Sequence, residues 1–228
     1  MEAIQTPIIL VNFKTYIEAT GKKAMLLARK AERVSHETGT CIGLAPQYTD
    51  ITEITRSVDL PTFAQHVDPI DAGSSTGHIL PEAVKQAGAV GTLVNHSERR
   101  IRLADIDSVI QRCRKLDLVS VVCTNNTNVS VSTATLEPSF IAIEPPELIG
   151  TGVPVSKAKP EIISDTVSRV RKVNPDVNVL CGAGITQGED VTAALKLGTK
   201  GVLVASGVVK TKEPERVLTE FAEAIHTV

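Results

Sequence analysis

Residues 177–205, VNVLCGAGITQGEDVTAALKLGTKGVLVA, hold two short apolar runs separated by an amphipathic segment. The runs 177–181 and 201–205 are apolar at almost every position, which is typical of strands buried on both faces. The segment 189–197 has apolar residues at helical spacing, and Gly198 follows it as a helix-ending residue. This order of strand, helix and strand predicts a parallel pair with a helical crossover.

The same alternation extends along the whole chain. Six further apolar runs are expected strands, at 8–12 (IILVN), 41–45 (CIGLA), 62–66 (TFAQH), 91–95 (GTLVN), 119–123 (VSVVC) and 140–144 (FIAIE). Helical patterns lie between them, at 22–36, 82–87, 105–116 (with Asp105 as its expected cap), 161–173 and 214–225, and more weakly at 49–57 and 126–131. Eight such units without a linker predict a single domain, 1–228, an α/β fold in which eight parallel strands close into a compact (β/α)8 barrel with a reduced helix after 119–123. A doubly wound sheet is the less favoured arrangement.

Composition excludes several classes of protein. Apolar residues make up 42% of the 228 residues, which is enough for a core, so the chain is not a disordered one. Lys and Arg number 24 against 26 Asp and Glu, a balance that disfavours nucleic-acid and membrane partners. The four cysteines form no C-x-x-C pair, and neither a signal peptide nor a membrane span is visible. We therefore expect a cytoplasmic protein that holds no metal.

Charged and polar side chains follow three of the expected strands. Lys14 comes just after run 8–12, His96 just after run 91–95, and Glu144 closes run 140–144. In a barrel the carboxyl ends of all strands meet at one face, where chemistry takes place. Ser97 is the expected N-cap of a helix whose positive end would keep the His96 ring neutral. A carboxylate after a run as apolar as FIAI is costly to bury unless it is used.

Small residues follow the last two strands. Gly182-Ala183-Gly184 comes after run 177–181, and Ser206-Gly207 after run 201–205. Loops after the seventh and eighth strands are the usual phosphate site of barrels, because glycines let backbone amides approach an anion. A stretch of lid length with two glycines, 145–152, follows Glu144.

These groups together predict one kind of chemistry. A carboxylate can remove a proton from the carbon next to a carbonyl, while an imidazole and an ammonium stabilise charge on the oxygen. A phosphate site would hold the far end of the substrate and orient the reacting carbons. The sequence therefore favours a cofactor-free isomerase acting on a small phosphorylated sugar.

Three motifs resemble those of the triosephosphate isomerase family: Asn12-x-Lys14, the HSERR of residues 96–100, and Glu144-Pro145 followed by the IGTG of residues 149–152. The likeness runs over nearly the whole chain. It implies interconversion of dihydroxyacetone phosphate and D-glyceraldehyde 3-phosphate through an enediolate. By resemblance, Glu144 is the base, His96 the neutral electrophile and Lys14 the electrostatic residue. Asn12 contacts the substrate, and Glu98 supports Lys14.

The resemblance also assigns binding positions. Gly150, Gly184, Ala205 and Ser206 stand where the family binds phosphate. Thr76, in the loop after run 62–66, stands where the family reaches into a neighbouring subunit. The lid begins PPEL without the Trp that many members carry, and Cys181 replaces a Tyr. This short pattern is similar to the archaeal form, which implies a homotetramer, with a dimer as the minimum.

Two alternatives remain open from the sequence. Another phosphate-binding barrel isomerase or epimerase would share the last two loops but need not carry HSERR. A non-catalytic phosphosugar sensor would have no need of Glu144. An assay for turnover of glyceraldehyde 3-phosphate separates both from the favoured interpretation.

Overall fold

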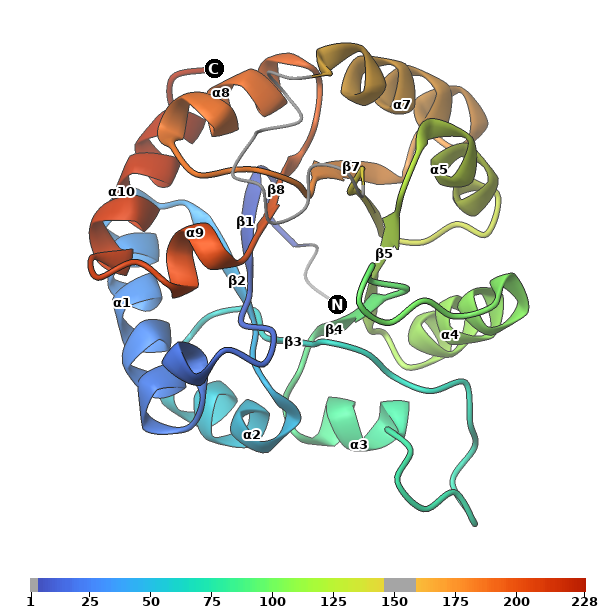
Figure 1. Ribbon diagram of the computed structural model, residues 1–228. Helices are drawn as coiled ribbons and strands as arrows, with labels where there is room; N and C mark the ends of the chain where they lie inside the picture. The colour runs from blue at the N-terminus through green and yellow to red at the C-terminus, as the bar shows by residue number, and fades with distance from the viewer. Residues whose placement is uncertain (1–3, 146–158) are drawn as a thin grey trace.

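Eight parallel strands form the centre of the structure, with helices packed around them (Figure 1). The computed structural model describes residues 4–145 and 159–228. In this part of the chain the strands are β1 Ile8–Asn12, β2 Cys41–Ala45, β3 Phe63–Ala64, β4 Gly91–Val94, β5 Val119–Thr124, β6 Phe140–Ile143, β7 Asn178–Cys181 and β8 Gly201–Val204.

The hydrogen-bonded order of the strands is β2-β1-β8-β7-β6-β5-β4-β3. The two ends of this order meet at an isolated parallel bridge between Leu44 and Thr62, where Leu44 N donates to Pro61 O at 2.9 Å. This bridge closes the ring, so the expected (β/α)8 barrel is confirmed. The expected strand 62–66 is shorter than its apolar run, because regular pairing covers only Phe63 and Ala64.

The helices lie outside the strands. They are α1 Lys22–Thr38, α2 Tyr48–Ser57, α3 Pro81–Gln86, α4 Leu103–Lys115, α5 Thr127–Ala134, α7 Pro160–Val173, α8 Gly188–Lys196, α9 Ser206–Val209 and α10 Pro214–Ile225, with a 3₁₀ turn η1 at Ile17–Ala19. The expected reduction after the fifth strand is present, since α5 has 8 residues against 17 in α1.

Two local expectations about caps have different outcomes. Gly198 follows the end of α8 with a φ of +94°, the conformation expected of a glycine that ends a helix. Asp105 is not a cap, because α4 begins earlier, at Leu103. Its carboxylate lies in the first turn of that helix and accepts two hydrogen bonds from Arg102 at 2.9 Å.

Alternation along each strand sorts the core into two layers. Ile8 and Leu10 belong to a buried cluster inside the barrel, whereas Ile9 and Val11 belong to the cluster between the strands and the helices. Both sets are buried because each strand has a filled barrel on one face and helices on the other. The scarcity of aromatic residues fits an interior filled mostly by Leu, Ile, Val and Ala.

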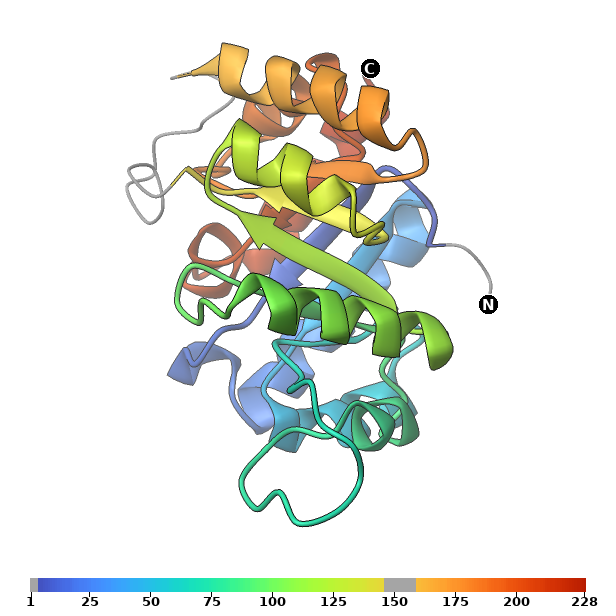
Figure 2. The same ribbon diagram turned by 90° about the vertical axis from the view of Figure 1, so that its right-hand side faces the viewer.

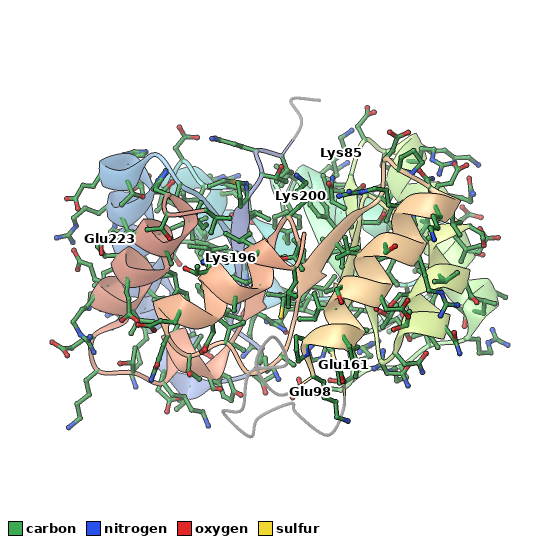
Figure 3. The ribbon with its side chains drawn as sticks, turned by 90° about the horizontal axis from the view of Figure 1, so that it is seen from above. Lys85, Glu98, Glu161, Lys196, Lys200 and Glu223 are labelled. Carbon is green, nitrogen blue, oxygen red and sulfur yellow. The ribbon has the colours of Figure 1, made fainter. Side chains whose placement is uncertain are left out.

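The two ends of the barrel carry different features. Figure 3 shows Glu98 and Glu161 at one end and Lys85 and Lys200 at the other. The end marked by Glu98 is the one to which the strands point. The loop between β3 and α3 extends away from the barrel (Figure 2). Within residues 4–145 and 159–228, none of the helices combines the length and the apolar character of a membrane span.

Candidate active site

The inward-facing residues of four strands lead directly into one pocket. Leu10, Ala142, Leu180 and Leu203 are buried inside the barrel. Two residues further along the same strands, the alternation of side chains places Asn12, Glu144, Gly182 and Ala205 on the same inner side. All four of these residues line a pocket at the carboxyl ends of the strands, together with Lys14, Tyr16, His96, Gly184 and Ser206.

His96 reaches the pocket by a break in this alternation. Asn95, the preceding residue, has a φ of +59°, a left-handed conformation that Asn tolerates better than most residues. Its side chain fixes this bend from both sides. Asn95 Nδ2 donates to Cys123 O at 3.0 Å, and Asn95 Oδ1 accepts from Ile101 N at 3.0 Å. The bend directs His96 rather than Asn95 toward the pocket.

The expected helix cap at Ser97 is wrong, because no helix begins there. Residues 96–99 form a turn in which Arg99 N donates to His96 O at 2.8 Å, and α4 starts only at Leu103. The turn still acts on the imidazole. Glu98 N donates to His96 Nδ1 at 3.2 Å, so Nδ1 is an acceptor and the ring proton lies on Nε2. A neutral ring with Nε2–H is therefore held by one amide rather than by a helix end.

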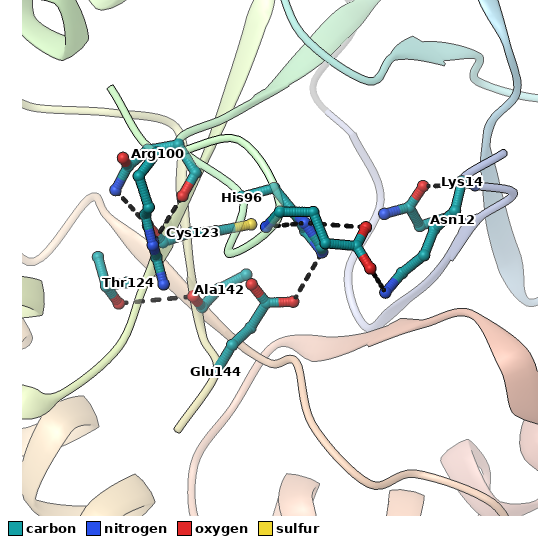
Figure 4. A network of polar contacts seen from close by, with 10 residues as sticks. Asn12, Lys14, His96, Arg100, Cys123, Thr124, Ala142 and Glu144 are labelled. Atoms are coloured by element: carbon teal, nitrogen blue, oxygen red, sulfur yellow. Dashed lines mark hydrogen bonds and ion pairs between the residues drawn. The ribbon is translucent and has the colours of Figure 1, made fainter. Parts of the chain in front are cut away.

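Glu144 and His96 meet across the pocket. Glu144 Oε1 lies 3.5 Å from His96 Nε2 (Figure 4), and the Glu144 side chain is only 3% exposed. Its other oxygen, Oε2, is buried and accepts no N–H or O–H hydrogen bond from the described residues, although the Cys123 thiol lies against the carboxylate as a weak donor. A buried carboxylate with an unused acceptor is costly for stability, which indicates a group retained for function.

Lys14 is held by contacts at both its backbone and its ammonium. Its φ is +47°, and its N–H donates to Asn12 Oδ1 at 3.0 Å. Gln65 Nε2 donates to Lys14 O at 2.8 Å and to Ala45 O at 3.0 Å. The ammonium donates to Glu98 Oε1 at 2.9 Å. These contacts hold the Lys14 backbone in an unfavourable left-handed conformation. They thereby fix the position of its positive charge at the edge of the pocket.

Part of the pocket wall consists of small residues. Gly184, with a φ of +75°, lines it together with Ala205 and Ser206, the residues for which the sequence predicts an anion site. Ser206 begins α9, and the first amides of a helix have no partner within it. Gly150 lies outside the described residues. Thr76 lies on the extended loop after β3, is exposed, and is not among the residues lining this pocket.

Cys123 lies behind the catalytic carboxylate candidate. Complete burial raises the pKa of its thiol well above the ordinary value, and the nearby charge of Glu144 raises it further. The thiol is therefore neutral, in agreement with an inert buried cysteine. The described residues contain no group of three His, Cys, Asp or Glu side chains placed to hold a metal ion.

Comparison with known proteins decides the family. A family model described as triosephosphate isomerase matches residues 7–226. The chain belongs to the triosephosphate isomerase family. A protein of that name from Methanothermus fervidus is 56% identical over 94% of this chain and 97% of its own length. Those from Methanocaldococcus jannaschii and Methanobacterium bryantii are 55% and 54% identical, over 96% and 98% of this chain and 100% and 99% of their own lengths. Membership in the triosephosphate isomerase family makes the protein an isomerase.

Sequence reasoning missed several residues of this triosephosphate isomerase site. Tyr16 lines the pocket, and the ammonium of Lys210 lies 4.4 Å from the centre of its ring. The roles of Asn95 in turning His96 inward and of Gln65 in bonding to Lys14 were also not visible. An Asn at the end of an apolar run, such as Asn95, weakly indicates a left-handed bend. The contact of Gln65 with Lys14 joins residues far apart in the chain, so no local sequence pattern indicates it.

Proposed function

We propose that this pocket interconverts dihydroxyacetone phosphate and D-glyceraldehyde 3-phosphate through an enediolate, with Glu144 as the base. The observation that carries the proposal is the pairing of Glu144 with His96. Glu144 Oε1 lies 3.5 Å from the Nε2–H of His96, and Glu144 Oε2 accepts no N–H or O–H hydrogen bond from the described residues. One group can take a proton from carbon while the other donates a hydrogen bond to the adjacent oxygen.

The proposed steps balance without another reactant. Glu144 removes a proton from the hydroxymethyl carbon, and the electron pair of that bond forms the enediolate. His96 Nε2–H and the Lys14 ammonium stabilise the negative oxygen, and Asn12 contacts the same region. Glu144 then returns the proton to the neighbouring carbon while a hydroxyl proton moves between the two oxygens. Glu98 holds Lys14 through their 2.9 Å ion pair.

Phosphate binding belongs to the other wall of the pocket in this proposal. The amides of Gly184, Ala205 and Ser206 would hold the phosphate, with Gly150 contributing from outside the described residues. Their support is that Gly184, Ala205 and Ser206 line the same pocket as the acid–base groups. Holding the phosphate orients the reacting carbons against Glu144 and His96.

Assembly and location are also part of the proposal. We infer a single-domain subunit, 1–228, that forms a homotetramer in the cytoplasm, with a dimer as the smallest active form. Thr76 would then contact a neighbouring subunit's pocket. The support is that its loop extends away from its own barrel (Figure 2) and is largely exposed from residue 71 to residue 78. A mass measurement in solution tests this assembly.

The variant Glu144→Gln tests the base. It keeps the shape of the side chain but removes the proton acceptor, so kcat should fall by about 10²–10⁴. The affinity for inorganic phosphate, measured by competitive inhibition in the parent and by direct titration in the variant, should stay nearly unchanged. Glu223→Gln, on the exposed face of α10, is the matched control and should keep parental kinetics. Parental turnover in Glu144→Gln would reject Glu144 as the base.

A further inference from the structure

The loop of residues 69–78 is an exposed extension that needs an anchor. It leaves the barrel after β3 and returns at α3, and most of its side chains from 71 to 78 are exposed (Figure 2). Such a segment buries little apolar surface, so its direction depends on hydrogen bonds and ion pairs at its base.

Asp68 joins the two ends of this loop. Its backbone N–H donates to Ile79 O at 2.9 Å, and its carboxylate Oδ2 accepts from Ile79 N at 2.6 Å. Its carbonyl accepts from Ile70 N at 2.9 Å. One residue therefore bonds the residue that follows the loop through two separate contacts and also fixes the loop's first turn.

The same carboxylate contacts the catalytic side of the molecule. Asp68 Oδ1 lies 3.0 Å from His66 Nε2 and 3.6 Å from a guanidinium nitrogen of Arg99. The His66 carbonyl in turn accepts from Tyr48 Oη at 3.0 Å. Partial burial raises the pKa of Asp68, but the Ile79 amide, His66 and Arg99 outweigh it, so the pKa is lowered overall. The carboxylate is thus ionised, and each of its two oxygens has a hydrogen-bond partner.

Arg99 connects this cluster to the acid–base groups. It belongs to the turn that carries His96 and Glu98, and its N–H donates to His96 O at 2.8 Å. Glu98 in the same turn supplies the amide that fixes the His96 tautomer and the carboxylate that pairs with Lys14. A shift of this turn would therefore disturb both the electrophile and the cation of the site.

We propose that Asp68 is a positioning residue that couples the extended loop 69–78 to the turn carrying His96 and Glu98. This inference rests on the proposed function, because it takes the loop as the segment that reaches a neighbouring subunit. Through Ile79 and Ile70, Asp68 sets the direction of the loop. Through Arg99 it sets the position of the turn. A single carboxylate thereby links the surface used for assembly to the groups used for catalysis.

A double-variant cycle in the full-length protein tests this coupling. Asp68→Asn removes the charge and one acceptor, and Arg99→Gln removes only the partner, whose side chain is 58% exposed and not needed for the core. We expect each single variant to lower kcat/KM by about fivefold or more, and the double variant to match Asp68→Asn within about twofold. Independent, multiplying losses would overturn the coupling.

Amide hydrogen exchange adds a measurement that does not depend on turnover. In Asp68→Asn the amides of residues 70–79 should exchange about tenfold faster or more, whereas in Arg99→Gln they should change less than about twofold. Asp176→Asn, an exposed carboxylate between α7 and β7, is the matched control and should change neither kinetics nor exchange. Parental exchange in Asp68→Asn would reject the anchor.

The two proposals fail in different ways. If Glu144 is not the base, Glu144→Gln keeps parental turnover, whereas the exchange of residues 70–79 still reports on Asp68. If Asp68 does not couple the loop to the turn, the parent isomerises and depends on Glu144, but the losses of Asp68→Asn and Arg99→Gln multiply in the double variant.

Discussion

Gly182 lies so close to Glu144 that position 182 has no room for a side chain. A Cβ atom on Gly182 would lie 2.5 Å from Cγ of Glu144 and 3.2 Å from Ile143 O. The backbone cannot move away easily, because Gly182 N donates to Ile143 O at 3.0 Å. The glycine therefore allows the carboxylate to stand between β6 and β7 and face His96.

Replacing Gly182 with Ala should displace the carboxylate and slow the chemistry. We expect kcat of Gly182→Ala to fall by about 10- to 100-fold, since a shift of roughly 1 Å in a reacting group has effects of this size. KM should change less, because the phosphate wall is untouched. Steady-state kinetics measure both. Gly39→Ala, at the end of α1, is the control: its Cβ has open space, and although a φ of +70° strains an alanine there and lowers stability, kcat should stay parental. Parental kcat in Gly182→Ala would refute this account of the contact.

The strand positions of the barrel could be predicted because they depend on local pattern. Runs such as 8–12 and 140–144 are buried on both faces. Their residues must therefore be apolar whatever packs against them, and the sequence alone reveals them. Given eight such runs, the parallel arrangement places Glu144 and Asn12 at one face. The contact between Gly182 and Glu144 could not be predicted, because it depends on the distance between two adjacent strands.

The tautomer of His96 can be observed directly. Because Glu98 N donates to Nδ1, we expect nitrogen NMR of ring-labelled histidine to show Nδ1 unprotonated and Nε2 protonated at neutral pH. His96→Gln identifies the signal by its loss. A ring protonated on both nitrogens, or on Nδ1 alone, would contradict the assignment.

Gln65 supports Lys14 from outside the pocket. Gln65→Leu removes both donors, leaving the carbonyls of Lys14 and Ala45 without them and releasing the left-handed backbone of Lys14. We expect kcat/KM to fall by about tenfold, through kcat as well as KM, because the ammonium both binds the anionic substrate and stabilises the negative oxygen. Gln86→Leu, exposed at the end of α3, should have no such effect. Parental kcat and KM in Gln65→Leu would argue against the role of Gln65.

His66 makes stability depend on pH. Burial lowers the pKa of His66 below its ordinary value of about 6.5, although the hydrogen bond that its ring donates to Asp68 opposes this shift and Arg99 adds to it. The unfolded chain therefore takes up a proton at this residue before the folded protein does. The free energy of unfolding should fall as the pH drops from about 6.5 through the lower folded-state pKa, by at most about 1.4 kcal/mol per pH unit.

Denaturant unfolding at a series of pH values checks this expectation. His66→Gln should make the decline below about pH 6.5 shallower than in the parent, because its proton uptake is removed. His36→Gln, exposed in the last turn of α1, should leave the decline unchanged. An identical slope in His66→Gln and the parent would show that His66 does not carry the effect.

The site was predictable in its residue types and less so in its geometry. Lys14, His96 and Glu144 could be selected because polar groups after buried runs are costly unless used. The neutral state of His96 was expected from a helix beginning at Ser97, but a turn supplies the amide instead. Tyr16 was missed because its place in the pocket depends on where η1 packs, which its own sequence does not indicate.

Isomerisation in deuterium oxide is the most direct test of Glu144 as the base. A proton taken from carbon by a carboxylate exchanges with solvent, so dihydroxyacetone phosphate should give glyceraldehyde 3-phosphate with deuterium at the carbon next to the aldehyde. In Glu144→Gln the rates of isomerisation and deuterium entry should fall together, by about 10²–10⁴. Deuterium entry at the parental rate in Glu144→Gln would contradict the assignment.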